Sequence, residues 1–223
     1  MEYSVMNNPI QQEILQLEAS FSQNSAGLAV PVLKSINHKG ITWEITLAND
    51  QVCQMHSTFN DIDHEIYVVH VDARKFYYYW LKSSQFLNQP TRREVNCSLI
   101  KDMPKDHKFH RAAAGFANSH FNPVPLAFIS PSVQQGHDCI AFNNGVTRTI
   151  WLLANGAKSF PIEVHKQQMA QHLFGLAGIG EPPLSNQDYK DRHCVQKPYY
   201  LTQAYFDTFK DDWLESAELN ERK

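Results

Sequence analysis

The pattern of hydrophobic and polar positions predicts strands and helices that alternate along most of the chain. Residues 66–71 read IYVVHV and are apolar on both faces, which predicts a strand in the centre of a sheet. Asp72 follows this strand, and an Asp in that position can cap a helix. In such a helix Phe76 and Trp80 would lie one turn apart and stack in the core.

The densest part of the pattern runs from Phe142 to Val164 and reads FNNGVTRTIWLLANGAKSFPIEV. Apolar residues follow helical spacing from Val146 to Ala157, and Asn155-Gly156 is a usual helix stop. Residues 159–165 then alternate between polar and apolar, which predicts a half-buried strand. The block thus predicts a strand, a Gly turn, a helix and a second strand. Six of its residues are expected in the core: Phe142, Ile150, Leu153, Phe160, Ile162 and Val164.

Weaker patterns flank this block. Two helices are expected over Pro9–Ala19 and around Met169–Leu176, and a third starts at a capping Asp102. Strands are expected over residues 28–33, 41–47, 52–56, 126–129 and 139–142. Residues from Pro182 to Pro198 are polar and loop-like, and an acidic amphipathic helix is expected from Thr202 onward.

These elements predict an α/β or α+β fold with a small mixed sheet and short helices. Three parts are expected. Residues 1–64 would form a strand-rich N-terminal extension, residues 65–180 the core, and residues 181–223 a C-terminal loop and acidic helix.

The turn before the predicted helix carries the candidate chemistry. Asn and Gly tolerate left-handed backbone geometry, so the chain can turn sharply there, and Thr147 or Thr149 can cap the helix. A helix that starts at a tight turn presents backbone N–H groups at the positive end of its dipole, and Arg148 adds a planar guanidinium. The sequence therefore predicts a phosphate or nucleotide site made of Asn143, Asn144, Gly145, Thr147 and Arg148.

The same turn resembles the G-x-H-R box of the ParB/sulfiredoxin fold, in which a strand, a Gly turn and a short helix hold a nucleotide phosphate. Two segments, KFHRAAAGFANSHFNPVPLAFI (residues 108–129) and the FNNG-to-FPIEV block, are similar to the plasmid fertility inhibition factors of bacterial conjugative plasmids. The resemblance runs from about Glu65 to Gly178.

The turn departs from the superfamily pattern at one position. Thr147 stands where the broad superfamily has His, and a threonine hydroxyl forms hydrogen bonds but does not act as an acid or base near neutral pH. Sulfiredoxin's own reaction needs a cysteine in this turn, and residues 143–148 contain none. That activity is therefore set aside.

The resemblance implies a plasmid-encoded protein of the donor cytoplasm that blocks conjugative transfer of a co-resident plasmid. It implies the conjugation machinery as partner, at the coupling ATPase or at relaxase–DNA delivery to a type IV secretion channel. ATP and Mg²⁺ are the candidate cofactors. Two alternatives stay open: a nucleotide-binding enzyme with ATPase or DNase activity, and a plasmid-partition DNA adaptor.

The composition and net charge of the chain bear on which of these functions is favoured. With 223 residues, of which 43% are hydrophobic, the chain can bury a sizeable core. Its net charge of −3 and pI near 6.4 argue against a dedicated duplex-DNA binder. Four basic residues could form a local patch that binds DNA, which keeps DNA as a less favoured partner: Lys101, Lys105, Lys108 and Arg111. The simpler interpretation is that they form the solvent-exposed face of an amphipathic helix.

The sequence contains no recognisable targeting signal, membrane-spanning segment or metal-binding motif. No signal peptide and no run of about 18 apolar residues is present, so we expect no membrane insertion and a cytoplasmic protein. The four cysteines form no CxxC pair, and the histidines match no zinc motif. Asp61, Asp63 and Glu65 offer oxygens to Mg²⁺, although a solvated turn is the favoured interpretation. No catalytic residue is identified.

Overall fold

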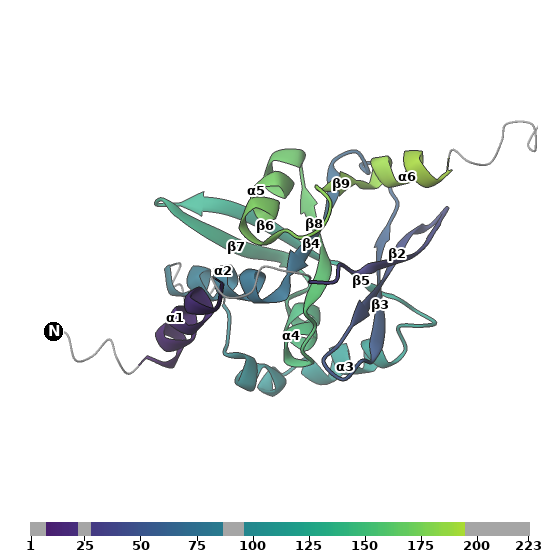
Figure 1. Cartoon of the computed structure of the whole chain (residues 1–223). Coiled ribbons are helices and arrows are strands. Elements are labelled where there is room, and N and C mark those ends of the chain that lie inside the picture. The colour runs from purple at the N-terminus through teal and green to yellow at the C-terminus, as the bar shows by residue number, and fades with distance from the viewer. Residues whose placement is uncertain (1–7, 22–27, 87–95, 195–223) are drawn as a thin grey trace, which may run out of the picture.

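A computed structural model describes residues 8–21, 28–86 and 96–194, which contain two β-sheets and helices around them (Figure 1). The first sheet has the order β1 (Val32–Asn37), β2 (Gly40–Thr46), β3 (Val52–Thr58), β5 (Val124–Pro125). The second has the order β7 (His137–Asn144), β6 (Ala127–Gln134), β8 (Ser159–His165), β4 (Ile66–Asp72), β9 (Leu184–Ser185). The helices are α1 (Pro9–Phe21), α2 (Ala73–Phe86), the 3₁₀ helix η2 (Ile100–Lys105), α3 (Phe109–Ala117), α4 (Val146–Ala154), α5 (Gln167–Ala177) and α6 (Asn186–Cys194).

Both sheets are mixed, so the expected α/β class is confirmed. In the second sheet β6 runs parallel to β8, while β7 and β4 are antiparallel to their neighbours. In the first sheet β1, β2 and β3 form an antiparallel meander, and the short β5 adds to β3 in parallel.

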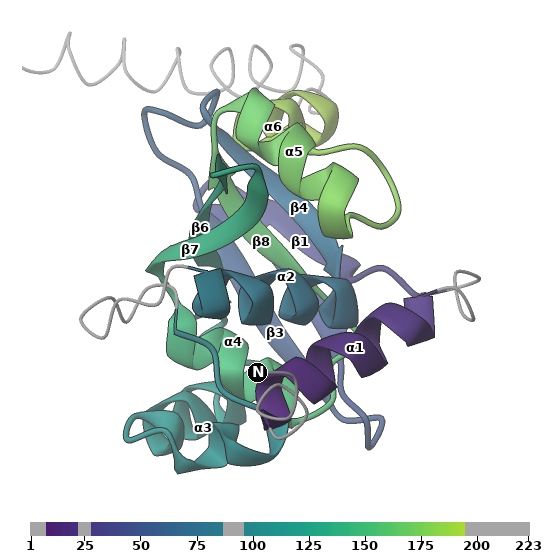
Figure 2. The same ribbon diagram turned by 90° about the vertical axis from the view of Figure 1, so that its left-hand side faces the viewer.

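Strand β8 lies in the middle layer of the fold. On one side α2 and α5 cover the second sheet (Figure 2), and the Phe76 ring of α2 lies 5.6 Å from that of Phe160. On the other side the first sheet packs against it, with the rings of Trp43 and His70 6.1 Å apart. Most of β8 is therefore buried on both faces. The expectation of a half-buried strand is wrong, because a second sheet covers the face that the sequence pattern assigns to solvent.

The predicted core is confirmed. Each of the six residues expected there is buried: Phe142, Ile150, Leu153, Phe160, Ile162 and Val164. Asp72 caps α2, because its Oδ1 accepts a 2.8 Å hydrogen bond from the backbone N–H of Arg74. Phe76 and Trp80 lie one turn apart in the core as expected, but their rings do not stack: the centroids are 6.4 Å apart and the planes are tilted by 53°. The periodicity of apolar residues was sufficient for these local features.

Three expectations about boundaries need correction. The helix expected from Asp102 is split, because Asp102 lies inside η2 and α3 begins only at Phe109. The first strand begins at Val32 and not at residue 28. The segment expected to be loop-like after Pro182 contains β9 and α6. The helix expected from Thr202 lies outside the described residues.

Candidate functional site

The turn between β7 and α4 depends on a single glycine. Gly145 has φ 93° and ψ 9° and is the N-cap of α4. A Cβ at this position would lie 2.6 Å from the Cα of Ala127, so left-handed geometry and close approach both require glycine. Asn143 and Asn144 remain in strand β7, so the expectation that they share the left-handed turn is wrong.

The start of α4 has no side-chain cap. The Thr149 hydroxyl donates to the carbonyl oxygen of Gly145 at 3.2 Å, one turn back, and Thr147 makes no side-chain hydrogen bond with a described residue. Neither threonine therefore caps the helix. The N–H groups of the first turn lack a side-chain acceptor, and this end of the helix dipole favours an anion.

A cavity of about 610 Å³ opens at this end of α4 and is called the α4 cavity here. Thr147 lines one side, and residues 105–108 of the η2–α3 corner line another. Lys105 is paired with Asp102 at 2.6 Å, whereas the Lys108 ammonium has no partner among the described residues. The structure thus brings part of the basic patch to the helix start that the sequence singled out. The cavity is also lined by Asp102, which pairs with Lys105, and by Asp106, whose Oδ1 accepts a 2.8 Å hydrogen bond from the backbone N–H of Lys108. The helix start and the unpaired Lys108 ammonium are the features of this cavity that suit a phosphate or carboxylate group.

Arg148 does not line the α4 cavity. Its Nη1 donates a 2.9 Å hydrogen bond to the carbonyl oxygen of Pro125, and its charge acts on Glu163 of β8. The guanidinium therefore lies on the sheet side of the turn. Burial lowers the pKa of Arg148, and Glu163 partly offsets this effect.

The two asparagines of the predicted site lie elsewhere. Asn143 accepts a 2.7 Å hydrogen bond at Oδ1 from the Ser130 hydroxyl, and it borders a separate cavity of about 360 Å³ with Phe128 and His165. Asn144 is exposed at the end of β7. Of the five predicted residues, the structure places Thr147 at the α4 cavity, Gly145 next to it as the N-cap of α4, Arg148 beside Glu163, and the asparagines apart from both.

A network of buried polar side chains connects the two sheets and α6, and the sequence did not predict it. The Ser57 hydroxyl donates to Oε1 of Glu163 at 2.5 Å and accepts from Nδ2 of Asn186 at 2.8 Å. Nδ2 of Asn186 also lies 3.4 Å from Oδ1 of Asp63, whose Oδ2 pairs with the Lys190 ammonium. This set, Lys190–Asp63–Asn186–Ser57–Glu163, is called the intersheet network below.

Glu163 is the titratable group of this network that responds near neutral pH. Burial raises the pKa of its carboxyl to about 7, while Ser57 and Arg148 act in the opposite direction. The carboxyl borders a small cavity of about 170 Å³ together with His56 and Asn60. A carboxyl with this pKa can accept or donate a proton under physiological conditions. Its sequence context, FPIEV, gave no signal of this because the groups that act on it, Ser57 and Arg148, come from β3 and α4.

The acidic cluster considered for Mg²⁺ is divided by the fold. Asp63 pairs with Lys190, whereas Oε2 of Glu65 lies 3.0 Å from Nε2 of His165. Within residues 8–21, 28–86 and 96–194 no group of three or more His, Cys, Asp or Glu side chains is placed to hold a metal ion. Cys53, Cys97 and Cys139 are free and buried, and burial raises the pKa of their thiols.

A family model matches about half of this chain, and a known protein sequence matches most of it. The profile of the family described as plasmid fertility inhibition factor matches residues 68–178. Protein osa of Shigella flexneri is 31% identical over 171 residues, which cover 76% of this chain and 86% of that protein.

A solved structure is similar over nearly the whole described fold. It is the crystal structure of the oncogenic suppression activity protein, described as a plasmid fertility inhibition factor. It has 28% sequence identity and a TM-score of 0.74, with 84% of this chain and 95% of that chain covered. None of the helices described in this chain is long and apolar enough to cross a membrane. On the identity and coverage of these matches, the chain belongs to the plasmid fertility inhibition factor family.

Proposed function

We propose that this protein acts in the donor cytoplasm and blocks conjugative transfer of a co-resident plasmid by binding the transfer machinery. The coupling ATPase and the relaxase–DNA complex that it delivers to a type IV secretion system are the proposed targets. The observation that carries the proposal is the similarity to protein osa and to the solved fertility inhibition factor over most of the chain.

The α4 cavity is the proposed nucleotide-phosphate site. Val146 and Thr147 of the first turn of α4 and Lys108 line one cavity, and their backbone N–H groups, hydroxyl and ammonium are the donors proposed for the phosphate. The strand, Gly turn and helix also support a ParB/sulfiredoxin-like assignment for this part of the fold. ATP is the proposed ligand, and Mg²⁺ would be held mainly through its phosphates, because the described residues contain no group of three or more His, Cys, Asp or Glu side chains placed to hold a metal ion.

An enzymatic role, ATP hydrolysis or DNA cleavage, is the second candidate. The observation in its favour is the Glu163 carboxyl, which has a pKa of about 7 and lies beside Arg148 and the Ser57 hydroxyl. A buried acid–base group next to a guanidinium is common at catalytic centres. On this alternative Glu163 would take a proton from an attacking water, and Arg148 would stabilise the negative charge that develops.

Mating frequency from donor cells separates the binding inhibitor from the enzyme. The wild-type protein should reduce transfer of a sensitive conjugative plasmid in a dose-dependent way. A binding inhibitor should retain this effect in Glu163→Gln at matched soluble levels, because the substitution keeps shape and removes only the proton exchange. Loss of inhibition together with loss of phosphate release or DNA nicking by the purified variant would favour the enzyme. Normal transfer in the presence of wild type, across several plasmid types, would overturn fertility inhibition itself.

Nucleotide binding is tested separately with a matched pair of lysines. Lys108→Gln removes the unpaired ammonium of the α4 cavity, whereas Lys101→Gln changes an exposed lysine of η2 that does not line it. The first variant should weaken ATP and ADP binding by about tenfold or more, and the second should not. No binding by wild type, or equal binding by the two variants, would remove this site. Arg148→Ala is less suitable because Arg148 also contacts Pro125 and acts on Glu163.

A further inference from the structure

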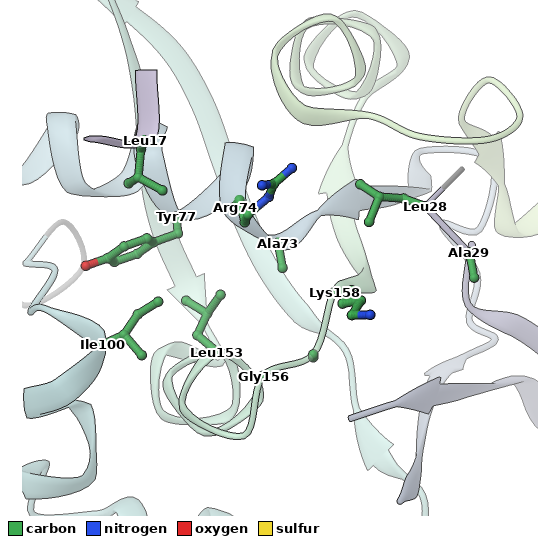
Figure 3. A pocket seen from close by; sticks show the side chains of 11 residues that line it. Leu17, Leu28, Ala29, Ala73, Arg74, Tyr77, Ile100, Leu153, Gly156 and Lys158 are labelled. Atoms are coloured by element: carbon green, nitrogen blue, oxygen red, sulfur yellow. The ribbon is translucent and has the colours of Figure 1, made fainter. Parts of the chain in front are cut away.

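A second large cavity, of about 600 Å³, lies near the opposite end of α4 from the proposed phosphate site. It is formed between α1, α2, η2 and the connection from α4 to β8, and it is called the α1–α2 cavity here (Figure 3). Its residues Leu153 and Gly156 belong to the last turn and C-cap region of α4, whereas Thr147 of the α4 cavity lies in the first turn. The two cavities share no lining residue.

The α1–α2 cavity has an apolar end and two cations further along it, beyond which Leu28 and Ala29 also line the wall (Figure 3). Leu17, Tyr77 and Ile100 gather at one end, and Leu153 continues the apolar wall toward the middle (Figure 3). Arg74 and Lys158 lie toward the other end, on the side of Leu28 (Figure 3). The apolar wall and the two cations follow one another along the cavity, so an elongated ligand would contact both at once.

Neither of the two cations is neutralised within the described residues. The Arg74 guanidinium and the Lys158 ammonium form no hydrogen bond or ion pair with any described side chain, and no carboxylate lines the cavity. The nearest carboxylate in the sequence, that of Asp72, is buried and caps α2. A backbone hydrogen bond of 3.0 Å from Ala73 N–H to the Lys158 carbonyl holds the two cation-bearing segments together.

We propose that the α1–α2 cavity binds an amphiphilic carboxylate, an unbranched acyl chain with a carboxylate head group. The acyl chain lies against Leu17, Tyr77, Ile100 and Leu153, and the carboxylate lies between Arg74 and Lys158. The volume falls in the range of ordinary small-molecule sites, which are mostly apolar with a few polar groups that fix orientation. A guanidinium and an ammonium form charge-assisted hydrogen bonds with a carboxylate. Each methylene group of the acyl chain that moves from water to the apolar wall makes the binding free energy more favourable.

The same features disfavour other ligands. A nucleotide would place its polar base against leucine and isoleucine side chains, where its hydrogen-bonding groups find no partners. A cationic amphiphile would meet two like charges at the head-group end. The site is therefore distinct in chemistry, as well as in place, from the proposed phosphate site.

The test is calorimetric titration of the full-length protein with octanoate, decanoate and dodecanoate below their micelle concentrations. Affinity should rise about fourfold for each added methylene until the apolar end is filled. Decanol should bind more weakly than decanoate, and decyltrimethylammonium should not compete with it. No binding of any carboxylate, or equal affinity for decanoate and the ammonium amphiphile, would overturn the proposal.

A double variant locates the head group. Arg74→Gln with Lys158→Gln should weaken decanoate binding by roughly tenfold to a hundredfold while leaving decanol binding unchanged. Lys75→Gln is the matched control, since Lys75 is the next residue of α2 and does not line the cavity. Equal decanoate binding by the double variant and the control would overturn the assignment. A peptide with an apolar C-terminal residue that binds more tightly than every acyl carboxylate, and loses affinity in the double variant, would assign the cavity to a protein partner instead.

Discussion

Ser57 and Glu163 are 106 residues apart in the chain, and the Ser57 hydroxyl donates a 2.5 Å hydrogen bond to Oε1 of Glu163. Ser57 belongs to β3 of the first sheet and Glu163 to β8 of the second, so this bond joins the two sheets. Ser57 is fully buried, and Asn186 and Asp63 extend the network toward α6. The interface between the sheets is thus polar where Glu163 faces it. We therefore expect the protonation state of Glu163 to affect the free energy of unfolding.

The first prediction concerns the pH dependence of stability. The pKa of Glu163 rises from its ordinary value of 4.5 to about 7 on folding, so the folded state binds the proton more tightly than the unfolded chain. This contribution is fully present below the unfolded pKa and is lost as pH rises through about 7. Between about pH 4.5 and about pH 8 the wild type should lose about 3 kcal/mol relative to Glu163→Gln.

Denaturant unfolding of both proteins across this pH range provides the measurement. Burial lowers the pKa of His70 to about 4, which makes the fold less stable as pH falls below about 6.5. Because His70 is present in both proteins, its contribution cancels in the difference between them. Parallel stability curves for wild type and Glu163→Gln would show that the carboxyl is ionised equally in the folded and unfolded states.

The second prediction concerns the ion pair at the other end of the intersheet network. The Asp63 side chain is only 2% exposed and is paired with Lys190. Lys190→Met keeps an apolar side chain of similar length but removes the ammonium, which pairs with Asp63 and lies 4.6 Å from the centre of the Phe59 ring. The buried carboxylate is left without its cation, which should destabilise the fold by roughly 3 kcal/mol. Asp63→Asn in the same background should recover part of the loss, because the uncompensated charge is removed. A thermodynamic cycle with no coupling between the two positions would contradict this.

The third prediction compares two glycines with left-handed backbones. Gly136→Ala, at φ 79°, has open space for a Cβ and should cost only the left-handed strain of about 1 kcal/mol. Gly145→Ala, at φ 93°, places its Cβ 2.6 Å from the backbone of Ala127 and should cost a further 1–3 kcal/mol or so. Equilibrium unfolding of both variants measures the difference. Equal costs would show that β6 can move away from the turn freely.

The fourth prediction tests the core with two leucines. Leu153 is 5% exposed on α4, and its replacement by alanine should destabilise the fold by about 2–5 kcal/mol. Leu15 on α1 is 55% exposed, so Leu15→Ala should change stability by less than about 0.5 kcal/mol. Thermal or denaturant unfolding of the pair provides the test, and similar melting behaviour would remove Leu153 from the core.

The sequence alone was sufficient for features that depend on near neighbours in the chain. The alternation in residues 159–165, the helical spacing after Gly145 and the stop at Asn155-Gly156 correspond to β8, α4 and its C-cap region. Each depends on side chains two to four positions apart or on one residue's backbone preference. The similarity of residues 108–129 and 142–164 to fertility inhibition factors likewise needs no tertiary information, and it identified the family.

The tertiary structure alone decided which faces of these elements are covered and which groups meet. It turned Arg148 toward Pro125 and Glu163 and left Thr147 at the α4 cavity with Lys108. It covered Glu163 partly and brought it to Ser57 of β3. Periodicity gives the direction of a side chain relative to its own backbone, but the pKa of Glu163 depends on its burial, on Ser57 of a strand 106 positions away and on Arg148 of the preceding helix. The position of Ser57 relative to Glu163 follows from the packing of one sheet on the other, which no local pattern in the sequence records.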